Sequence, residues 1–232
     1  KYDALVVDEG QDINRKQWDS LLWSLHDPYK NPVYIFHDNN QKVYNKDELD
    51  LPDFPKYPHI LKKNYRNSQD IFATQKSYYK GESTTSEGPK GESVSYFIAP
   101  TREIAEKKII NLINKYTINE GMDKKQIAIL TGNKLGTSSS ILGNYLTKDF
   151  NGKKKDNLYF VKAEKNEKDE IVFDSIKRFK GLEREIVILF DLEDALENPE
   201  EMYIGLSRPK LILDIIGTEK NIEILNKISE DG

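Results

Sequence analysis

Short apolar runs recur along the 232-residue chain, with segments of helical periodicity between them. The runs lie at residues 4–9, 32–38, 94–99, 126–132, 185–191 and 211–217. Hydrophobic residues are continuous within each run instead of alternating with polar ones, which is typical of strands that are covered on both faces. The pattern therefore predicts an α/β fold in which parallel sheets are flanked by helices.

Three segments between the runs have helical signals. In the first, Asn14 and Gln17 resemble a capping box and predict a helix over about 14–26. Its apolar residues follow the spacing i, i+3, i+4 and i+7, and we interpret them, together with Trp23, as core: Trp18, Leu21, Leu22 and Leu25. A second helix is expected after Thr101 as its N-cap, and a third after Ser68, ending by Gly81.

A boundary is predicted in the stretch at 80–93, which is rich in Gly, Ser, Thr and charge and has no apolar anchor. Such a composition is typical of a linker or an exposed loop. We expect one unit over residues 1–80, a linker over 81–93 and a larger α/β unit over 94–232.

Bulk composition excludes several classes of protein. With 35 basic and 39 acidic side chains the net charge is −4, so nucleic-acid binding would have to be local. The absence of cysteine excludes disulfides and thiolate metal sites. No stretch is long and apolar enough for a membrane span, and no secretory signal is visible, so a cytoplasmic location without membrane partners is expected. The first residue, Lys1, directly precedes a strand, which suggests a fragment without its upstream part.

Carboxylates gather where two predicted strands end. Asp8 and Glu9 follow the first run and Asp38 follows the second. Ligands of open parallel sheets bind beyond the carboxyl ends of the strands, and two adjacent acids there need a cation or hydrogen-bond donors. A strand-to-loop turn or a helix cap is the alternative interpretation.

Further polar segments follow in the sequence. They are "HDNNQKVY" at 37–44, "LKKNYRNS" at 61–68, "DSIKRFKGLEREIVIL" at 174–189 and "EEMYIGLSRPKLIL" at 200–213. Each is a weak signal alone, because a single arginine is usually solvated and "KGLE" suits a helix-to-strand turn. Their order and spacing make chance agreement improbable.

Together these segments resemble the later motifs of superfamily 1 helicases of the UvrD/Rep type. "VVDEGQD" is similar to motif II (Walker B), "HDNNQKVY" to motif III, "LKKNYRNS" to motif IV, "SIKRFKGLE" to motif V and "YIGLSRPK" to motif VI. The resemblance spans almost the whole chain and is closest to helicase modules that accompany nuclease-related domains. It implies a RecA-like P-loop NTPase fold, with a partial first lobe carrying motifs II to IV and a complete second lobe carrying motifs V and VI.

The resemblance also implies an ATP- and Mg²⁺-dependent DNA helicase. Asp8 would hold Mg²⁺ through water, and Glu9 would orient and deprotonate the attacking water at the metal. Gln11, Gln41 and Asp38 would belong to the γ-phosphate edge. Arg66 and Arg208 resemble arginine fingers, which we expect two different domains to supply.

Other motif residues would contact the nucleoside and the nucleic acid. By resemblance, Tyr65 lies against adenine, and Glu183, preceded by Gly181, meets the ribose. Ser175 and Lys177 stand where the family has Thr and His and would contact single-stranded DNA, or RNA.

One family element is absent from the sequence: no "GxxxxGK[ST]" phosphate loop (Walker A) occurs. In the family it lies upstream of motif II, so an upstream part of the same protein is the expected partner, and the chain alone is expected to hydrolyse no ATP appreciably. The glycines of 130–140 suggest a loop that touches the nucleic acid or a plain surface loop. The segment 42–52 lacks a base-stacking tryptophan, which favours translocation over unwinding.

Two alternatives stay open from the residues. The chain could be a non-enzymatic nucleic-acid-binding or interaction module derived from the helicase fold, with the lysines of 151–157 as a phosphate patch, although a solvated loop explains that run as well. Another kind of P-loop ATPase would explain motif II but would leave motifs IV to VI without a role.

Overall fold

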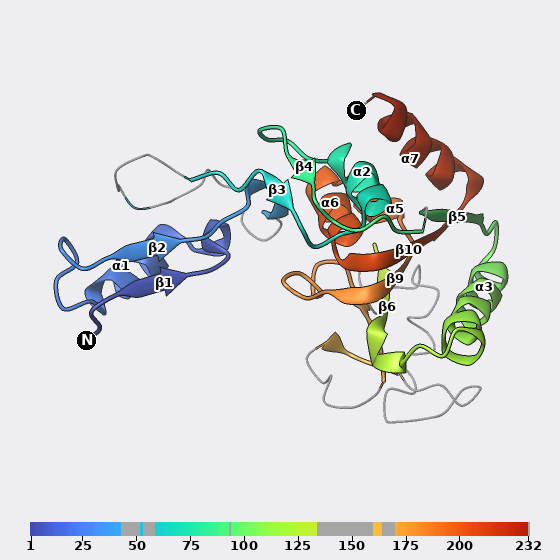
Figure 1. Ribbon diagram of the computed structural model, residues 1–232, viewed down its shortest axis with the longest axis horizontal. Coiled ribbons are helices and arrows are strands. Elements are labelled where there is room, and N and C mark those ends of the chain that lie inside the picture. The colour runs from blue at the N-terminus through green and yellow to red at the C-terminus, as the bar shows by residue number, and fades with distance from the viewer. Residues whose placement is uncertain (43–51, 53–58, 93, 134–159, 164–169, 232) are drawn as a thin grey trace. The chain divides into compact units, whose positions relative to one another are not determined.

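The structure, a computed structural model, describes residues 1–42, 52, 59–92, 94–133, 160–163 and 170–231. The chain folds into two compact units, Lys1–Leu61 and Lys62–Gly232 (Figure 1). Motif IV therefore lies in the second unit, whereas the sequence pattern placed it with the first.

The first unit is built on two parallel strands, β1 (Leu5–Val7) and β2 (Val33–Ile35), joined through helix α1 (Arg15–Trp23). Short 3₁₀ turns follow each strand, η1 at Gly10–Asp12 and η2 at Asn39–Gln41. The predicted capping box of α1 is confirmed, because the Asn14 side chain accepts from the Gln17 amide and the Gln17 side chain accepts from the Asn14 amide.

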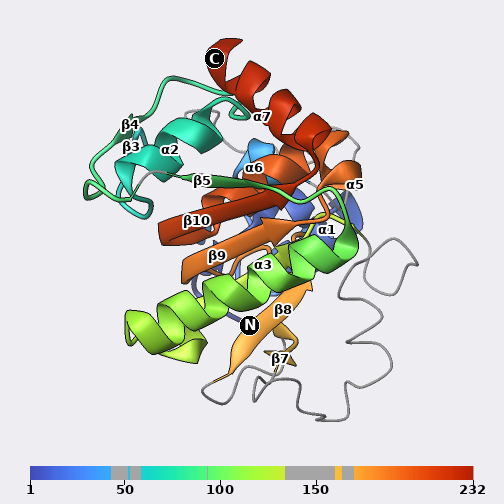
Figure 2. The ribbon, with the colours of Figure 1, turned by 90° about the vertical axis from the view of Figure 1, so that its right-hand side faces the viewer.

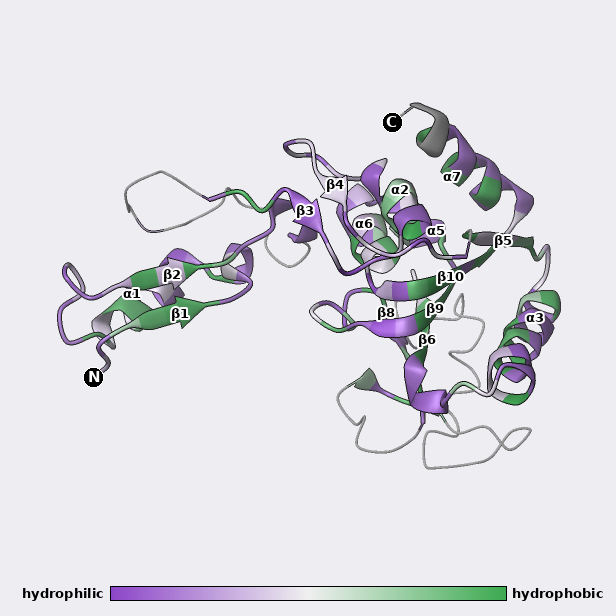
Figure 3. Cartoon of the chain, viewed as in Figure 1, coloured by the Kyte–Doolittle hydropathy of each residue, from purple (hydrophilic) through white to green (hydrophobic). Residues whose placement is uncertain are grey.

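Only part of the apolar surface of the first unit is covered. Trp18 and Leu25 are fully buried, as the helical stripe predicts. Trp23 is 72% exposed, so its interpretation as core is wrong: it is the last helical residue and does not follow the spacing of the stripe. Tyr34 and its register partner Val6 are exposed as well, although Figure 3 shows both strands as largely hydrophobic. Within the described residues of this unit, the two strands are therefore not covered on both faces, contrary to the prediction from the apolar runs.

The second unit contains a six-stranded, fully parallel sheet in the order β5-β10-β9-β6-β8-β7. The strands are β5 (Ser95–Ile98), β6 (Ile127–Thr131), β7 (Phe160–Val161), β8 (Ile171–Ser175), β9 (Arg184–Phe190) and β10 (Pro209–Gly217). The apolar runs at 94–99, 126–132, 185–191 and 211–217 correspond to four of these strands. The predicted mixed α/β class with a parallel sheet is confirmed, and the architecture is compatible with a RecA-like fold.

Helices cover both faces of this sheet, which is why its strands are continuously apolar. Helix α3 (Arg102–Asn114), capped by Thr101 as predicted, lies across one face (Figure 2) and packs on Ile129, Phe173 and Ile188. The other helices are α2 (Gln69–Lys76), α5 (Glu193–Leu196), α6 (Pro199–Ser207) and α7 (Glu219–Asp231), and all four contact one another or β10. A π-helical turn, η3 (Lys115–Asn119), and a 3₁₀ turn, η4 (Lys124–Gln126), connect α3 to β6.

The predicted linker lies inside the second unit. Its residues Thr85–Ser86 form β4, which pairs in parallel with β3 (Lys63–Asn64). Gly88 packs so closely that a Cβ atom there would lie 1.9 Å from the Asn67 carbonyl oxygen, so only glycine fits. The segment therefore fixes motif IV instead of separating two domains.

Among the described helices none is long and apolar enough to cross a membrane.

Candidate functional site

The polar residues of motifs II and III meet at one edge of the first unit. Because β1 and β2 are parallel, Asp8 and Glu9 after β1 and Asp38 after β2 lie at the same end of the sheet. Backbone hydrogen bonds continue the pairing there, from Phe36 N to Val7 O (2.8 Å) and from Gly10 N to Phe36 O (2.9 Å). The sequence prediction of this edge is correct in its placement.

Gln11 joins the two strand ends. Its side chain is almost fully buried, and its Nε2 donates to Glu9 Oε2 (2.6 Å) while its Oε1 accepts from the Asp38 amide (3.0 Å). One amide side chain therefore sets the distance between motif II and motif III. Asp38 in turn caps the η2 turn, because its carboxylate accepts from the Asn40 amide (2.9 Å) and from Gln41 Nε2 (2.9 Å).

Glu9 has a left-handed backbone with φ +54°, which is uncommon for a residue with a side chain. Such backbone strain persists where the surroundings enforce it and clusters at functional sites. Asp8 is exposed, and its Oδ1 accepts from the Glu9 amide (2.9 Å). The two neighbouring carboxylates thus have different hydrogen-bond donors, the Glu9 amide for Asp8 and the Gln11 side chain for Glu9.

The described residues include no group of three or more His, Asp or Glu side chains that could enclose a metal ion. Mg²⁺ retains several waters and often takes only one or two protein carboxylates plus substrate phosphates. The exposed carboxylate of Asp8 fits this mode of binding, in which water and phosphate supply most of the Mg²⁺ ligands.

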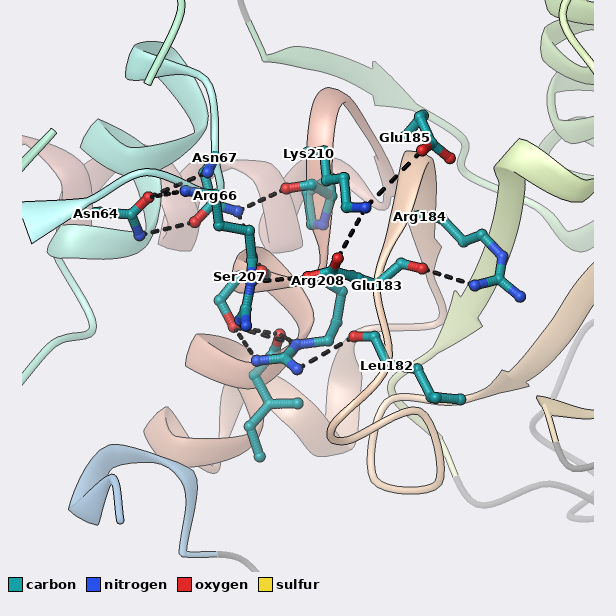
Figure 4. A network of polar contacts seen from close by, with 12 residues as sticks. Asn64, Arg66, Asn67, Leu182, Glu183, Arg184, Glu185, Ser207, Arg208 and Lys210 are labelled. Atoms are coloured by element: carbon teal, nitrogen blue, oxygen red, sulfur yellow. Dashed lines mark hydrogen bonds and ion pairs between the residues drawn. The ribbon is translucent and has the colours of Figure 1, made fainter. Parts of the chain in front are cut away.

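Three cations of the second unit, Arg66, Arg208 and Lys210, lie near the carboxylate of Glu183 (Figure 4). Glu183 Oε2 lies 2.8 Å from Arg66 Nε, and Glu183 Oε1 lies 2.7 Å from Lys210 Nζ. The hydrogen bond from Lys210 and the charges of Arg66 and Arg208 hold the pKa of Glu183 below its usual range. Glu183 directly precedes β9 and Lys210 is the second residue of β10, so the cluster lies at the amino ends of these strands.

Arg208 is positioned differently from Arg66. It is 2% exposed, and its guanidinium donates to the Ile204 carbonyl (3.0 Å), the Leu182 carbonyl (3.2 Å) and Ser207 Oγ (2.7 Å). The Arg66 side chain is 47% exposed. Both arginines lie in the second unit, whereas the sequence resemblance assigned them to two different domains. Asn67 and Ser68, which precede α2, donate hydrogen bonds to backbone carbonyls of residues 207–210.

Asn67 connects the two arginine segments, a role that the sequence did not reveal. Its buried Nδ2 donates to the carbonyls on either side of Arg208, those of Ser207 (3.1 Å) and Pro209 (2.6 Å). Its Oδ1 accepts from Asn64 Nδ2 (2.9 Å) and Gln75 Nε2 (3.1 Å). The sequence signal was an Asn directly after the motif arginine, which periodicity alone could not distinguish from a turn residue.

The nucleoside candidates lie on exposed backbone near this cluster. Tyr65 is exposed, and its side chain interacts with that of Lys63, whose pKa is raised mainly by Glu87 and also by Tyr65. Gly181 has φ +79°, a conformation that favours glycine, and it forms the turn that leads into Glu183. Glu183 is engaged by cations here, whereas the sequence resemblance assigned it to a ribose.

The nucleic-acid candidates lie at the carboxyl end of β8, with Ser175 as its last residue and Lys177 two residues beyond it. The Ser175 hydroxyl accepts from the Arg178 amide (3.4 Å), and Ser175 is buried. Lys177 Nζ lies 2.9 Å from Glu201 Oε2, a carboxylate on α6 that is 3% exposed. Burial raises the pKa of Glu201, and Lys177 opposes that rise. Lys177 therefore compensates a buried charge of its own unit.

Several predicted segments lie outside the described residues: most of the loop at 130–140, the lysine run at 151–157 and nearly all of 42–52.

Comparisons with known proteins found similar chains among the solved structures. No protein-family model matches the chain, and no curated protein matches it. Among solved structures, the C-terminal domain of a possible DNA helicase from Lactobacillus plantarum WCFS1 is similar at 17% sequence identity, with a TM-score of 0.48, over 66% of this chain and 87% of that one.

Proposed function

We propose that the chain is part of the motor core of an ATP-dependent superfamily 1 helicase or translocase that acts on single-stranded nucleic acid, DNA in the first place. The observation that carries the proposal is the cluster of Arg66, Glu183 and Arg208. Three segments far apart in the sequence, each of which resembles a different motif, supply these residues to one place. Chance resemblances would have no reason to converge.

In the proposed reaction the first unit provides the carboxylates. Asp8 is exposed and suits a water-coordinated Mg²⁺, which when bound supplies charge neutralisation to phosphate oxygens. Glu9 orients and deprotonates water, and the hydrogen bond from Gln11 holds its carboxylate toward the motif III edge.

The second unit provides cations for the charge that develops on the transferred phosphoryl group. Because the Arg66 side chain is half exposed, it can leave its ion pair with Glu183 and bind a phosphate group instead. Arg208 is buried, and the carbonyl oxygens of Ile204 and Leu182 and the Ser207 hydroxyl hold its guanidinium in place. Both arginines fit the electrostatic role of arginine fingers.

The experiment is ATP hydrolysis by the complete gene product that contains this chain, measured with and without single-stranded DNA. Stimulation by DNA, lost in both Glu9→Gln and Arg66→Ala, is expected. Arg66→Ala is preferable to Arg208→Ala, because removal of the buried Arg208 would also orphan backbone carbonyls.

The matched control for this experiment is Lys62→Ala, which removes a surface cation from a simple ion pair with Glu82 and should leave turnover unchanged. DNA binding without any ATP hydrolysis by the complete gene product would instead favour a non-enzymatic binding module. Steady turnover by the 232 residues alone would contradict the expectation that they need an upstream phosphate loop.

A further inference from the structure

Lys210 is a cation of the arginine cluster to which no motif resemblance assigned a role. It reaches Glu183 from β10, whereas Arg66 reaches the same carboxylate from the segment before α2. Each carboxylate oxygen has its own cation, at 2.7 and 2.8 Å. Glu185 lies farther from Lys210, at 3.9 Å.

This arrangement has the donor set of a phosphate site. A planar guanidinium and an ammonium that converge on two oxygens of one anion can also bind two phosphate oxygens. The three side chains are between 35% and 47% exposed, so a dissolved anion can approach them. Arg208 adds positive potential, since its charge contributes to the lowered pKa of Glu183.

We infer that Arg66 and Lys210 form a polyphosphate-binding site on the second unit, and that Glu183 is its internal competitor. The inference rests on the proposed function only in assigning Arg66 to a phosphate. The Glu183 side chain is 38% exposed, so its carboxylate can be displaced toward solvent. Glu183 thereby lowers the affinity for any anion until a ligand with enough charge displaces it.

The test uses the 232-residue chain and sodium tripolyphosphate, which has neither base nor ribose, in isothermal titration calorimetry. Glu183→Gln keeps the shape of the side chain and removes its charge, and it should bind tripolyphosphate about tenfold more tightly than wild type, equivalent to roughly 1.4 kcal/mol. Adding Lys210→Met to Glu183→Gln should remove most of that gain. The matched control is Glu82→Gln, which releases Lys62 from a single ion pair and should change the affinity little.

An affinity of Glu183→Gln that is equal to or weaker than that of wild type would overturn the inference. If Glu183 served only a ribose, Glu183→Gln would weaken ATP binding and leave tripolyphosphate binding unchanged, which also overturns it. The outcome is separable from the proposed function. Tighter tripolyphosphate binding by Glu183→Gln supports the site even if the complete gene product shows no DNA-stimulated ATP hydrolysis. DNA-stimulated hydrolysis without tighter tripolyphosphate binding supports the proposed function and overturns the site.

Discussion

Replacing Asn67 by alanine should destabilise the second unit by about 4 kcal/mol, because four hydrogen bonds of a buried amide are lost at once. Each such bond contributes about 1 kcal/mol net, and a partner left buried without a bond costs more. The carbonyls of Ser207 and Pro209 would lose their side-chain donor, and the amides of Asn64 and Gln75 would lose their acceptor. Asn67→Asp keeps the volume but turns a carboxylate toward two carbonyl oxygens, so it should be at least as destabilising.

Two optical signals can separate the units in this experiment. Both tryptophans, Trp18 and Trp23, lie in the first unit, so tryptophan fluorescence during urea unfolding reports that unit, while far-ultraviolet circular dichroism reports the helices of both. Asn67→Ala should shift the circular dichroism transition to lower urea and leave the fluorescence transition in place.

The matched control is Asn226→Ala, which removes the same side chain from an exposed position of α7 and should change the free energy of unfolding by less than about 0.5 kcal/mol. A shift for Asn67→Ala no larger than that of Asn226→Ala would refute the bridging role of Asn67.

Three further predictions concern the charged residues of the two units. Glu9→Gly and Glu9→Ala both lose the hydrogen bond from Gln11, but only glycine adopts a φ of +54° without steric strain. Glu9→Gly should therefore be the more stable variant by about 1 kcal/mol in fluorescence-monitored unfolding. Equal stabilities would contradict backbone strain at this position. Because the folded pKa of Glu183 is depressed, the ionised side chain stabilises the fold above the ordinary value of 4.5, and this stabilisation is lost as the pH falls through the folded pKa. The difference in free energy of unfolding between wild type and Glu183→Gln should therefore shrink below pH 4.5, and a constant difference would argue against the ion pairs. Lys177→Met should destabilise the second unit by about 2 kcal/mol by leaving Glu201 buried without its cation, and Glu201→Gln in the same background should recover most of it; no recovery would show that Lys177 acts through other contacts.

Local patterns were sufficient for much of the fold. The apolar runs located β1, β2, β5, β6, β9 and β10. In the second unit the reason is that strands covered by helices on both faces are apolar over several consecutive positions. The caps at Asn14 and Thr101 were correct because capping depends on residues only three positions apart. Strand β8 was not recognised, because only three apolar residues precede Asp174 and Ser175, whereas the run of β10 continues with Ile215 and Ile216 beyond Asp214. Arg178 and the Ala163 and Ser175 amides compensate the buried charge of Asp174.

What the sequence could not reveal depends on contacts between distant segments. The boundary was expected at 81–93 because that stretch looks like a linker, yet β4 and Gly88 pack there against motif IV. The same packing brings Arg66 into the unit of Arg208. Lys210 and Asn67 have ordinary residue types in their local sequence, and only the fold shows that one reaches Glu183 and the other spans the backbone around Arg208.

The most direct test of the proposed reaction is the affinity of the complete gene product for ADP with aluminium fluoride, a mimic of the transferred phosphoryl group, compared with its affinity for ADP alone. If Glu9 and Arg66 act on that group, Glu9→Gln and Arg66→Ala should each weaken binding of the mimic by about 100-fold or more and leave ADP binding nearly unchanged. Equal binding of the mimic by wild type and both variants would contradict the assignment of these residues to ATP hydrolysis.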